Sequence, residues 1–218
     1  MVDDSALCEA CRAARVGAAR ALLAEGASPN ETSSSGATPL VLACESNRYE
    51  LISLLLTATA DANQQAYSGV SPLFTAASRN NPEVIRLLCA HGARADGVGN
   101  GYYTPMLACI KQKDGAAVAK ALLEAGADPN YHSEQWGTPL HAAASAGRPA
   151  ILKLLVAARA DLGSMHHGQT PLELAETRGA IDSVQVRRAA PIWLLRLTDH
   201  RAALAHASSA HLPPPPQS

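Results

Sequence analysis

Apolar residues in this chain fall into two short patterns that return together about every 33 residues. In the first, a leucine is followed by small apolar residues three and four positions later, as at Leu40, Ala43 and Cys44. This spacing puts the three side chains on one face of a helix. In the second, a block of leucines predicts another helix, over 50–56 in one unit and 82–89 in the next. Each unit is therefore predicted to be a pair of short helices.

Polar and turn-forming residues mark the ends of these helices at the same interval. A Thr or Ser, a Pro and an apolar residue recur with steps of 33, 33, 34 and 32 residues, at Thr38-Pro39-Leu40, Ser71-Pro72-Leu73, Thr104-Pro105-Met106, Thr138-Pro139-Leu140 and Thr170-Pro171-Leu172. Thr and Ser cap the first N–H groups of a helix, and Pro suits its first position. Asn47 and Asn80 tolerate a left-handed turn between the two helices, and Gly26, Gly92 and Gly126 fit the end of the second.

The shared period predicts a solenoid, in which each unit stacks only on its neighbours. Counting back 33 residues from Thr38 reaches a degenerate copy, Ser5-Ala6-Leu7, so we expect six units in one elongated domain. The fourth unit has one extra residue, around 113–115. The last unit has Val186-Arg187-Arg188 where the leucines are expected, which departs from the pattern of a second helix.

From about Ser5 to Ala190 the repeated unit resembles the ankyrin repeat, whose signature includes Thr-Pro-Leu-His-x-Ala. The unit that begins at Trp136 matches best, with Gly137-Thr138-Pro139-Leu140-His141-Ala142-Ala143-Ala144. The signature His is present only at His141; the other units have Cys8, Val41, Phe74, Leu107 and Glu173 there. The resemblance implies an all-α ankyrin-repeat solenoid of about six helix-turn-helix repeats joined by protruding β-hairpin loops, with a concave surface that binds other proteins.

On this reading the chain divides into four segments. Residues 1–35 form an N-terminal capping repeat, 36–167 form four central repeats, and 168–206 form a degenerate C-terminal repeat with a capping helix. Residues 207–218 include Pro213–Pro216 and are predicted to be a disordered, Pro-rich tail.

Composition narrows the classes of partner. The chain has 18 basic and 19 acidic residues without a basic run, so no nucleic-acid partner is expected. No apolar stretch approaches the roughly 20 residues that span a bilayer, and the acidic start does not resemble a signal peptide. Five cysteines, an odd number, favour a reducing compartment, the cytoplasm or the nucleus. We expect no cofactor and no small-molecule ligand.

Two groups of residues could form a catalytic or metal-binding site. Cys8 and Cys11 form a CxxC motif, which serves as a redox pair or as half of a metal site elsewhere. In the repeat register both occupy small packing positions, and no second CxxC completes a zinc site, so we interpret them as core residues. His166 and His167 are adjacent in one loop with no third ligand at zinc spacing. A thiol- or metal-dependent enzyme using either pair is the alternative from another functional class, but we predict a non-enzyme with no metal site.

Residues that the repeat does not dictate are the candidates for recognition, because loops carry side chains that packing does not constrain. Only 4% of the chain is aromatic, yet four of its five Tyr and one of its two Trp fall in the predicted hairpins. Tyr and Trp are common interface anchors. The predicted partner-binding residues are Tyr67, Arg79, Tyr102, Tyr103, Tyr131, Glu134, Trp136, His166, His167 and Arg178.

The predicted function is a scaffold or adaptor that binds a partner protein through the concave face and the hairpin tips. A variant of this function uses residues 192–197, Ile-Trp-Leu-Leu-Arg-Leu, as a second docking helix. A further alternative comes from the family resemblance, because some ankyrin proteins are substrates of asparagine hydroxylation in the hairpin. Asn30, Asn63 and Asn130 are in that register, where an Asn that stabilises the turn is the favoured interpretation.

Overall fold

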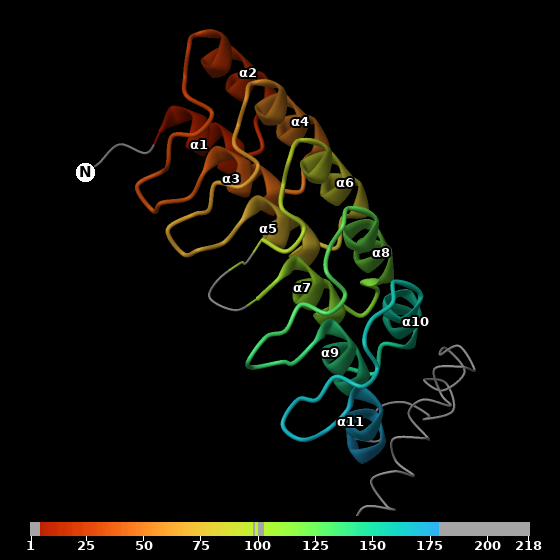
Figure 1. The fold of residues 1–218 in the computed structure, drawn as a ribbon. Coiled ribbons are helices and arrows are strands. Elements are labelled where there is room, and N and C mark those ends of the chain that lie inside the picture. Colours follow the sequence, from red (N-terminus) through yellow and green to blue (C-terminus); the bar gives the residue numbers. More distant parts are fainter. Residues whose placement is uncertain (1–4, 98, 100–102, 179–218) are drawn as a thin grey trace, which may run out of the picture.

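A computed structural model describes residues 5–97, 99 and 103–178 of the chain. In this part eleven helices form five antiparallel pairs and the first helix of a sixth pair (Figure 1). The helices are α1 (Ala6–Arg12), α2 (Val16–Ala24), α3 (Pro39–Glu45), α4 (Tyr49–Thr57), α5 (Pro72–Ser78), α6 (Pro82–Ala90), α7 (Pro105–Lys111), α8 (Ala116–Glu124), α9 (Pro139–Ser145), α10 (Pro149–Ala157) and α11 (Pro171–Arg178).

The helices make two layers. The first helices of the pairs, α1, α3, α5, α7, α9 and α11, pack on one another in chain order, and the second helices, α2 to α10, do the same behind them. Long loops project beyond the first-helix layer (Figure 1). In the described residues these loops contain no strand, only single antiparallel bridges such as Gly99 with Tyr103 and Ser133 with Gly137. The predicted all-α solenoid with protruding hairpin loops is confirmed.

The recurring Thr or Ser caps the first helix of the central pairs, as the sequence predicts. The hydroxyl oxygen of Thr38 accepts a hydrogen bond from the Val41 N–H at 3.2 Å, and Thr104 accepts from Leu107 at the same distance. Each such cap stabilises a helix by about 1 kcal/mol. These first helices are only seven residues long, so capping and packing on neighbours define them.

Turn residues also adopt the predicted conformations. Asn47 and Asn80 have φ angles of 53° and 56° between the helices of their pairs, and Gly26 has a φ of 95° after α2. The extra residue of the fourth repeat lies between α7 and α8, where Gln112 is extended, whereas the matching Ser46 and Arg79 are right-handed helical. A Cβ at Gly115 would lie 2.0 Å from the carbonyl oxygen of Cys109, so this longer turn requires glycine for close approach.

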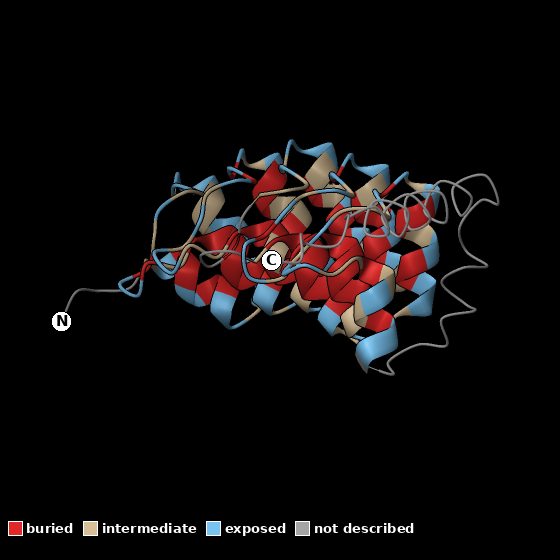
Figure 2. Ribbon diagram, turned by 60° about the horizontal axis from the view of Figure 1, so that its bottom comes forward, coloured by how far each residue is buried: buried red, intermediate tan, exposed pale blue. Residues whose placement is uncertain are grey.

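The core lies between the two layers (Figure 2). Leu51 and Leu55 of α4, and Leu122 and Leu155 of the later second helices, are completely buried. Burying one such side chain stabilises the fold by about 1.5–3 kcal/mol. Because each second helix contributes to the core, neighbouring repeats share one continuous apolar interior.

Several predictions concern residues outside the described part of the chain. These are Tyr102, the second helix of the last repeat with Val186-Arg187-Arg188, the docking helix at 192–197, and the Pro-rich tail at 207–218.

Candidate partner-binding surface

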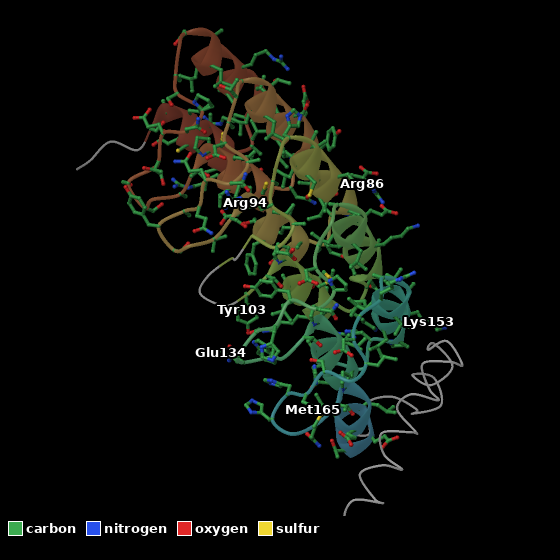
Figure 3. All side chains as sticks on the ribbon, in the orientation of Figure 1. Arg86, Arg94, Tyr103, Glu134, Lys153 and Met165 are labelled. Carbon is green, nitrogen blue, oxygen red and sulfur yellow. The ribbon has the colours of Figure 1, made fainter. Side chains whose placement is uncertain are left out.

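A row of aromatic rings links three successive repeats. Phe74, on α5, meets Tyr103 edge-on with ring centroids 6.5 Å apart. Tyr103 in turn lies 6.0 Å from Trp136, which precedes α9. Phe74 and Trp136 thus flank Tyr103, which lies on the hairpin side of the solenoid (Figure 3). Such ring pairs contribute about 0.5–1.5 kcal/mol beyond their buried area.

Lys111, the last residue of α7, lies against the same row. Its ammonium nitrogen is 4.1 Å from the Tyr103 ring centroid and 4.8 Å from that of Trp136. It also donates a hydrogen bond to the Tyr103 hydroxyl. Helical side chains incline toward the N-terminus, which brings Lys111 back over residues that precede its own helix. The result is a positive charge held on two aromatic faces.

Burial distinguishes these aromatic residues from Tyr67. Tyr103 and Trp136 are half-buried and pack against the core, and the indole Nε1 of Trp136 is buried without a hydrogen-bond acceptor. Tyr67 instead has 79% of its surface exposed. Its backbone N–H donates to the Gly36 carbonyl of the preceding hairpin at 3.0 Å. Tyr67 is therefore a solvent-facing aromatic residue on a hydrogen-bonded backbone, whereas Trp136 and Tyr103 partly cover the core.

Four histidines meet at the next two hairpins. The ring of His166 lies 4.0 Å from His167, 5.6 Å from His141 and 5.8 Å from His132, measured between centroids. Burial lowers the pKa of His166, and His167 and His132 lower it further. Burial also lowers the pKa of His141, although its contact with the Gln169 carbonyl opposes this. The cluster thus favours neutral rings.

His141 is held by backbone groups on both sides. Its Nδ1 accepts a hydrogen bond from the Thr138 N–H at 3.3 Å, and its Nε2 lies 3.1 Å from the Gln169 carbonyl oxygen. A carbonyl only accepts, so the proton belongs on Nε2. In the last repeat Glu173 replaces this His and accepts from the Thr170 N–H at 2.7 Å. The two side chains perform the same capping task at the starts of their helices.

The other predicted contact residues are dispersed. Arg79 is exposed at the C-terminal end of α5, Glu134 is exposed in a hairpin, and Tyr131 is half-buried. Arg178 is the last residue of α11. The structure adds Phe74 and His132 to the predicted contact residues. Phe74 occupies an ordinary helix position, so no sequence signal singles it out, while His132 lies among the predicted hairpin residues.

The thiols do not form a reactive site. Cys8 and Cys11 are completely buried among the first helices. Burial raises the pKa of Cys11 to about 12, with a smaller contribution from Cys8. A thiolate is the reactive and metal-binding form, so burial keeps Cys11 in the unreactive thiol form, and both side chains pack in the core. Within residues 5–97, 99 and 103–178, no group of three or more His, Cys, Asp or Glu residues could hold a metal ion.

Asparagine side chains connect consecutive repeats. Asn63 donates to the Gly92 carbonyl at 2.8 Å and accepts from the Arg94 N–H at 2.9 Å. Asn30 accepts from the Asp61 N–H, and Asn130 from the Asp161 N–H, each at 2.7 Å. Each of these amides bridges the loop of one repeat to the next. This geometry supports a structural role for all three asparagines.

Comparison with known proteins identifies the repeat. A family model described as "Ankyrin repeats (3 copies)" matches residues 2–66, 59–133 and 106–186. The chain belongs to the ankyrin-repeat family. Domains of this family are typically protein–protein interaction modules and generally non-catalytic. In the described residues of this ankyrin solenoid, no helix is long and apolar enough to cross a membrane.

Solved ankyrin structures resemble the whole solenoid. The human ASB11 ankyrin repeat domain is 32% identical, with a TM-score of 0.69 over 85% of this chain and 83% of that one. The ankyrin repeat domain of Bcl-3, a member of the IκB family, is 28% identical, with a TM-score of 0.73 over 82% and 81%. EF0377, an ankyrin repeat protein, shares the fold with a TM-score of 0.76 over 87% and 98% at 22% identity.

Curated proteins are similar over shorter stretches. Human neurogenic locus notch homolog protein 1 is 51% identical over 59 residues, which make up 26% of this chain and 2% of that protein. The ARF GTPase-activating protein Git of Drosophila melanogaster is 46% identical over 52 residues, 23% of this chain and 7% of that one. The aligned stretches are therefore a small part of these relatives.

Proposed function

We propose that this ankyrin solenoid is a non-enzymatic scaffold or adaptor that binds a partner protein on its concave face and hairpin tips. The observation that carries the proposal is Tyr67, an aromatic side chain 79% exposed whose ring lies against Gly36 and whose backbone N–H is bonded to the Gly36 carbonyl. Aromatic side chains fixed before binding lose little conformational entropy when a partner covers them.

The remaining contact residues extend this surface along the stack. They are Arg79, Tyr102, Tyr103, Tyr131, Glu134, Trp136, His166, His167 and Arg178. Hairpins of successive repeats line one side of a solenoid, so residues on several tips can meet one extended partner. Residues 36–167 supply most of these tips in our proposal, and 1–35 and 168–206 close the two ends of the stack.

The observations favour binding over catalysis. The thiols of Cys8 and Cys11 are buried, burial raises the pKa of Cys11, and none of the five cysteines forms a disulfide. Free thiols also fit a reducing compartment, so we propose the cytoplasm or the nucleus as the location. Hydroxylation of Asn30, Asn63 or Asn130 would appear as a one-oxygen mass increase in the hairpin peptides of protein purified from its own cells.

The experiment that tests the proposal compares two exposed tyrosines. Tyr67 lies in a hairpin, and Tyr49, which is 50% exposed, lies on α4 in the second-helix layer. Tagged protein is used to capture partners from a lysate of the source cell. Tyr67→Ala should weaken capture by more than about 1–2 kcal/mol, as for an aromatic anchor, whereas Tyr49→Ala should leave it unchanged.

A second pair of variants covers the aromatic row. Tyr67→Ala combined with Tyr103→Ala should abolish or severely weaken capture, and Lys153→Ala on the second-helix side serves as the control (Figure 3). Because Tyr103 is half-buried, its replacement can disturb the fold, and circular dichroism is used to check that each variant is folded. Normal capture by the folded tyrosine variants, together with loss in Tyr49→Ala or Lys153→Ala, would assign the partner to the convex side.

A further inference from the structure

Charged side chains are paired on the second-helix layer. Arg20 of α2 lies 3.6 Å from Glu50 of α4, and Arg86 of α6 lies 3.8 Å from Glu124 of α8. These pairs join the outer surfaces of neighbouring repeats. Each is exposed and contributes little to stability, about 0–1 kcal/mol, but each pairs a cation of one repeat with a carboxylate of the next.

Two cations on the first-helix layer are not paired. Among the residues that the structure describes, neither Arg79 nor Lys111 has a carboxylate within ion-pair distance. The nearby acidic residues, Asp114 in the turn after α7 and Glu134 in the next hairpin, are exposed and make no ion pair with them. Arg79 and Lys111 therefore keep their charges available to carboxylates of another molecule.

The backbones of Arg79 and Lys111 lie at the same end of adjacent helices, and the Lys111 side chain runs from there back toward Tyr103 and Trp136. The side-chain amide of Gln112 donates to the Ser78 carbonyl oxygen at 3.2 Å, which joins the C-terminal ends of α7 and α5. Arg79 directly follows Ser78, and Lys111 directly precedes Gln112. A carboxylate-rich chain that crosses from one repeat to the next can therefore meet both side chains.

An apolar, aromatic surface lies beside the charge of Lys111. Lys111 lies over the rings of Tyr103 and Trp136, and Phe74 continues the row into the preceding repeat. An ammonium group has three donors, and the Tyr103 hydroxyl uses one of them. Lys111 thus remains able to bind a carboxylate at the edge of a half-buried aromatic surface.

We infer that the occupant of this surface is an extended acidic segment of another protein, with an aromatic or aliphatic side chain beside its carboxylates. The inference rests on the proposed function, because it names the chemistry of the partner at the same concave face. The carboxylates pair with Arg79 and Lys111, and the apolar side chain packs on the aromatic row. The arrangement favours a peptide over nucleic acid, because two unpaired cations on a chain with a net charge of −1 supply few phosphate contacts.

A random peptide library tests this chemistry with the full chain. Displayed peptides of about 12 residues, about 40 Å when extended, are selected on immobilised protein. Selected sequences should carry net negative charge and at least one aromatic or aliphatic residue. A synthetic, fluorescently labelled copy of the dominant peptide then serves as the probe for fluorescence anisotropy.

Matched pairs of variants locate the binding. Arg79→Ser with Lys111→Met removes the two unpaired cations and keeps an apolar chain over the rings. We expect it to weaken peptide binding about two- to thirty-fold, the range for two exposed charge pairs. Arg86→Ser with Lys153→Met removes two cations from the second-helix layer and should leave affinity unchanged. Raising salt from about 0.15 M to about 1 M, which shortens the screening length from about 8 Å to about 3 Å, should also weaken binding.

The outcomes separate this inference from the proposed function. The selected peptides can instead be neutral or basic, and can lose binding with Tyr67→Ala but not with the Arg79 and Lys111 variant. This result would overturn the inference of an acidic partner, and the proposed binding at the concave face would stand. Displacement of the acidic peptide by a labelled oligothymidylate at about 0.15 M salt would assign the cations to nucleic acid instead. If peptide binding is lost only with Tyr49→Ala, or if no peptide is enriched from the library, both the inference and the proposed function are overturned.

Discussion

The aromatic ring of Tyr67 lies directly on Gly36 of the preceding hairpin, so that a Cβ at Gly36 would come within 2.1 Å of the Tyr67 Cδ2 atom. Gly36 also has a φ of 75°, a conformation that side chains rarely adopt. One hairpin therefore positions the exposed aromatic residue of the next, and the surface proposed for recognition depends on contacts between repeats.

Replacing this glycine should both destabilise the protein and move Tyr67. Gly36→Ala combines backbone strain with a steric clash, whereas Gly92→Ala, at a φ of 85° with no atom within 4 Å of its Cβ, has the strain alone. We expect Gly92→Ala to lower the free energy of unfolding by about 1–2 kcal/mol and Gly36→Ala to lower it further. Urea denaturation measures both values. Equal losses would show that Tyr67 does not rest on Gly36.

Core truncation tests the stacking of the repeats. Leu55 and Leu155 are completely buried in the second-helix layer. Leu55→Ala or Leu155→Ala should each lower the free energy of unfolding by about 2–5 kcal/mol, because each leaves a cavity between neighbouring repeats. The exposed Lys153→Ala should change it by less than about 0.5 kcal/mol. Losses below about 0.5 kcal/mol for both leucines would contradict the placement of the core.

Thiol reactivity should follow burial. Burial raises the pKa of Cys11 and of Cys109 to about 12, and it also raises the pKa of Cys44. Cys89 is only half-buried. In titration with a disulfide reagent near neutral pH, native protein should expose Cys89 alone, and Cys89→Ala should remove that reactivity. Fast reaction of Cys8 or Cys11 would support the alternative of a thiol- or metal-dependent enzyme. So would stoichiometric zinc that is lost in a Cys8→Ser and Cys11→Ser variant.

The histidine cluster predicts a dependence of stability on pH. The pKa values of His141 and His166 are lowered in the folded protein from the ordinary value of 6.5, chiefly by burial. A lowered pKa means that the unfolded chain binds protons more readily. The stability contribution of the neutral rings is therefore complete above pH 6.5 and is lost as pH falls through the folded pKa values.

A variant isolates this effect. His166→Gln removes the ring that lies closest to His167 and that also contacts His132 and His141. Denaturation measured between about pH 7.5 and about pH 5 should show a smaller loss of stability in His166→Gln than in the unchanged protein. Identical pH profiles would mean that the cluster does not couple folding to protonation.

Asparagine bridges give a last stability test. Asn63→Ala removes one donor and one acceptor, leaving the Gly92 carbonyl and the Arg94 N–H without their partner. Because both groups lie in exposed loops, water replaces part of the interaction, and we expect a loss of about 0.5–1.5 kcal/mol per hydrogen bond at most. Ser68→Ala, an exposed position in the following hairpin, is the control. A neutral Asn63→Ala would show that the bridge does not stabilise the stack.

The sequence by itself determined the solenoid, because the fold depends on local signals repeated in phase. Thr38 predicts a cap and Asn47 a left-handed turn, and each lies where its own short segment requires it. The extra residue near 113–115 was also predictable from the period. Its dependence on Gly115 was not, because the clash is with the Cys109 carbonyl across the turn.

Only the tertiary structure decided which candidate residues meet. The sequence identifies Tyr103, Trp136 and His166 as hairpin residues, but ring contacts between repeats depend on the rotation of one repeat relative to the next. Lys111 reaches Tyr103 because its side chain runs back along α7, and His132 reaches His166 across two hairpins. Burial likewise separates Tyr67 from Trp136 although both are aromatic residues of hairpins. Repeat spacing specifies the backbone, whereas side-chain surroundings arise from packing between repeats.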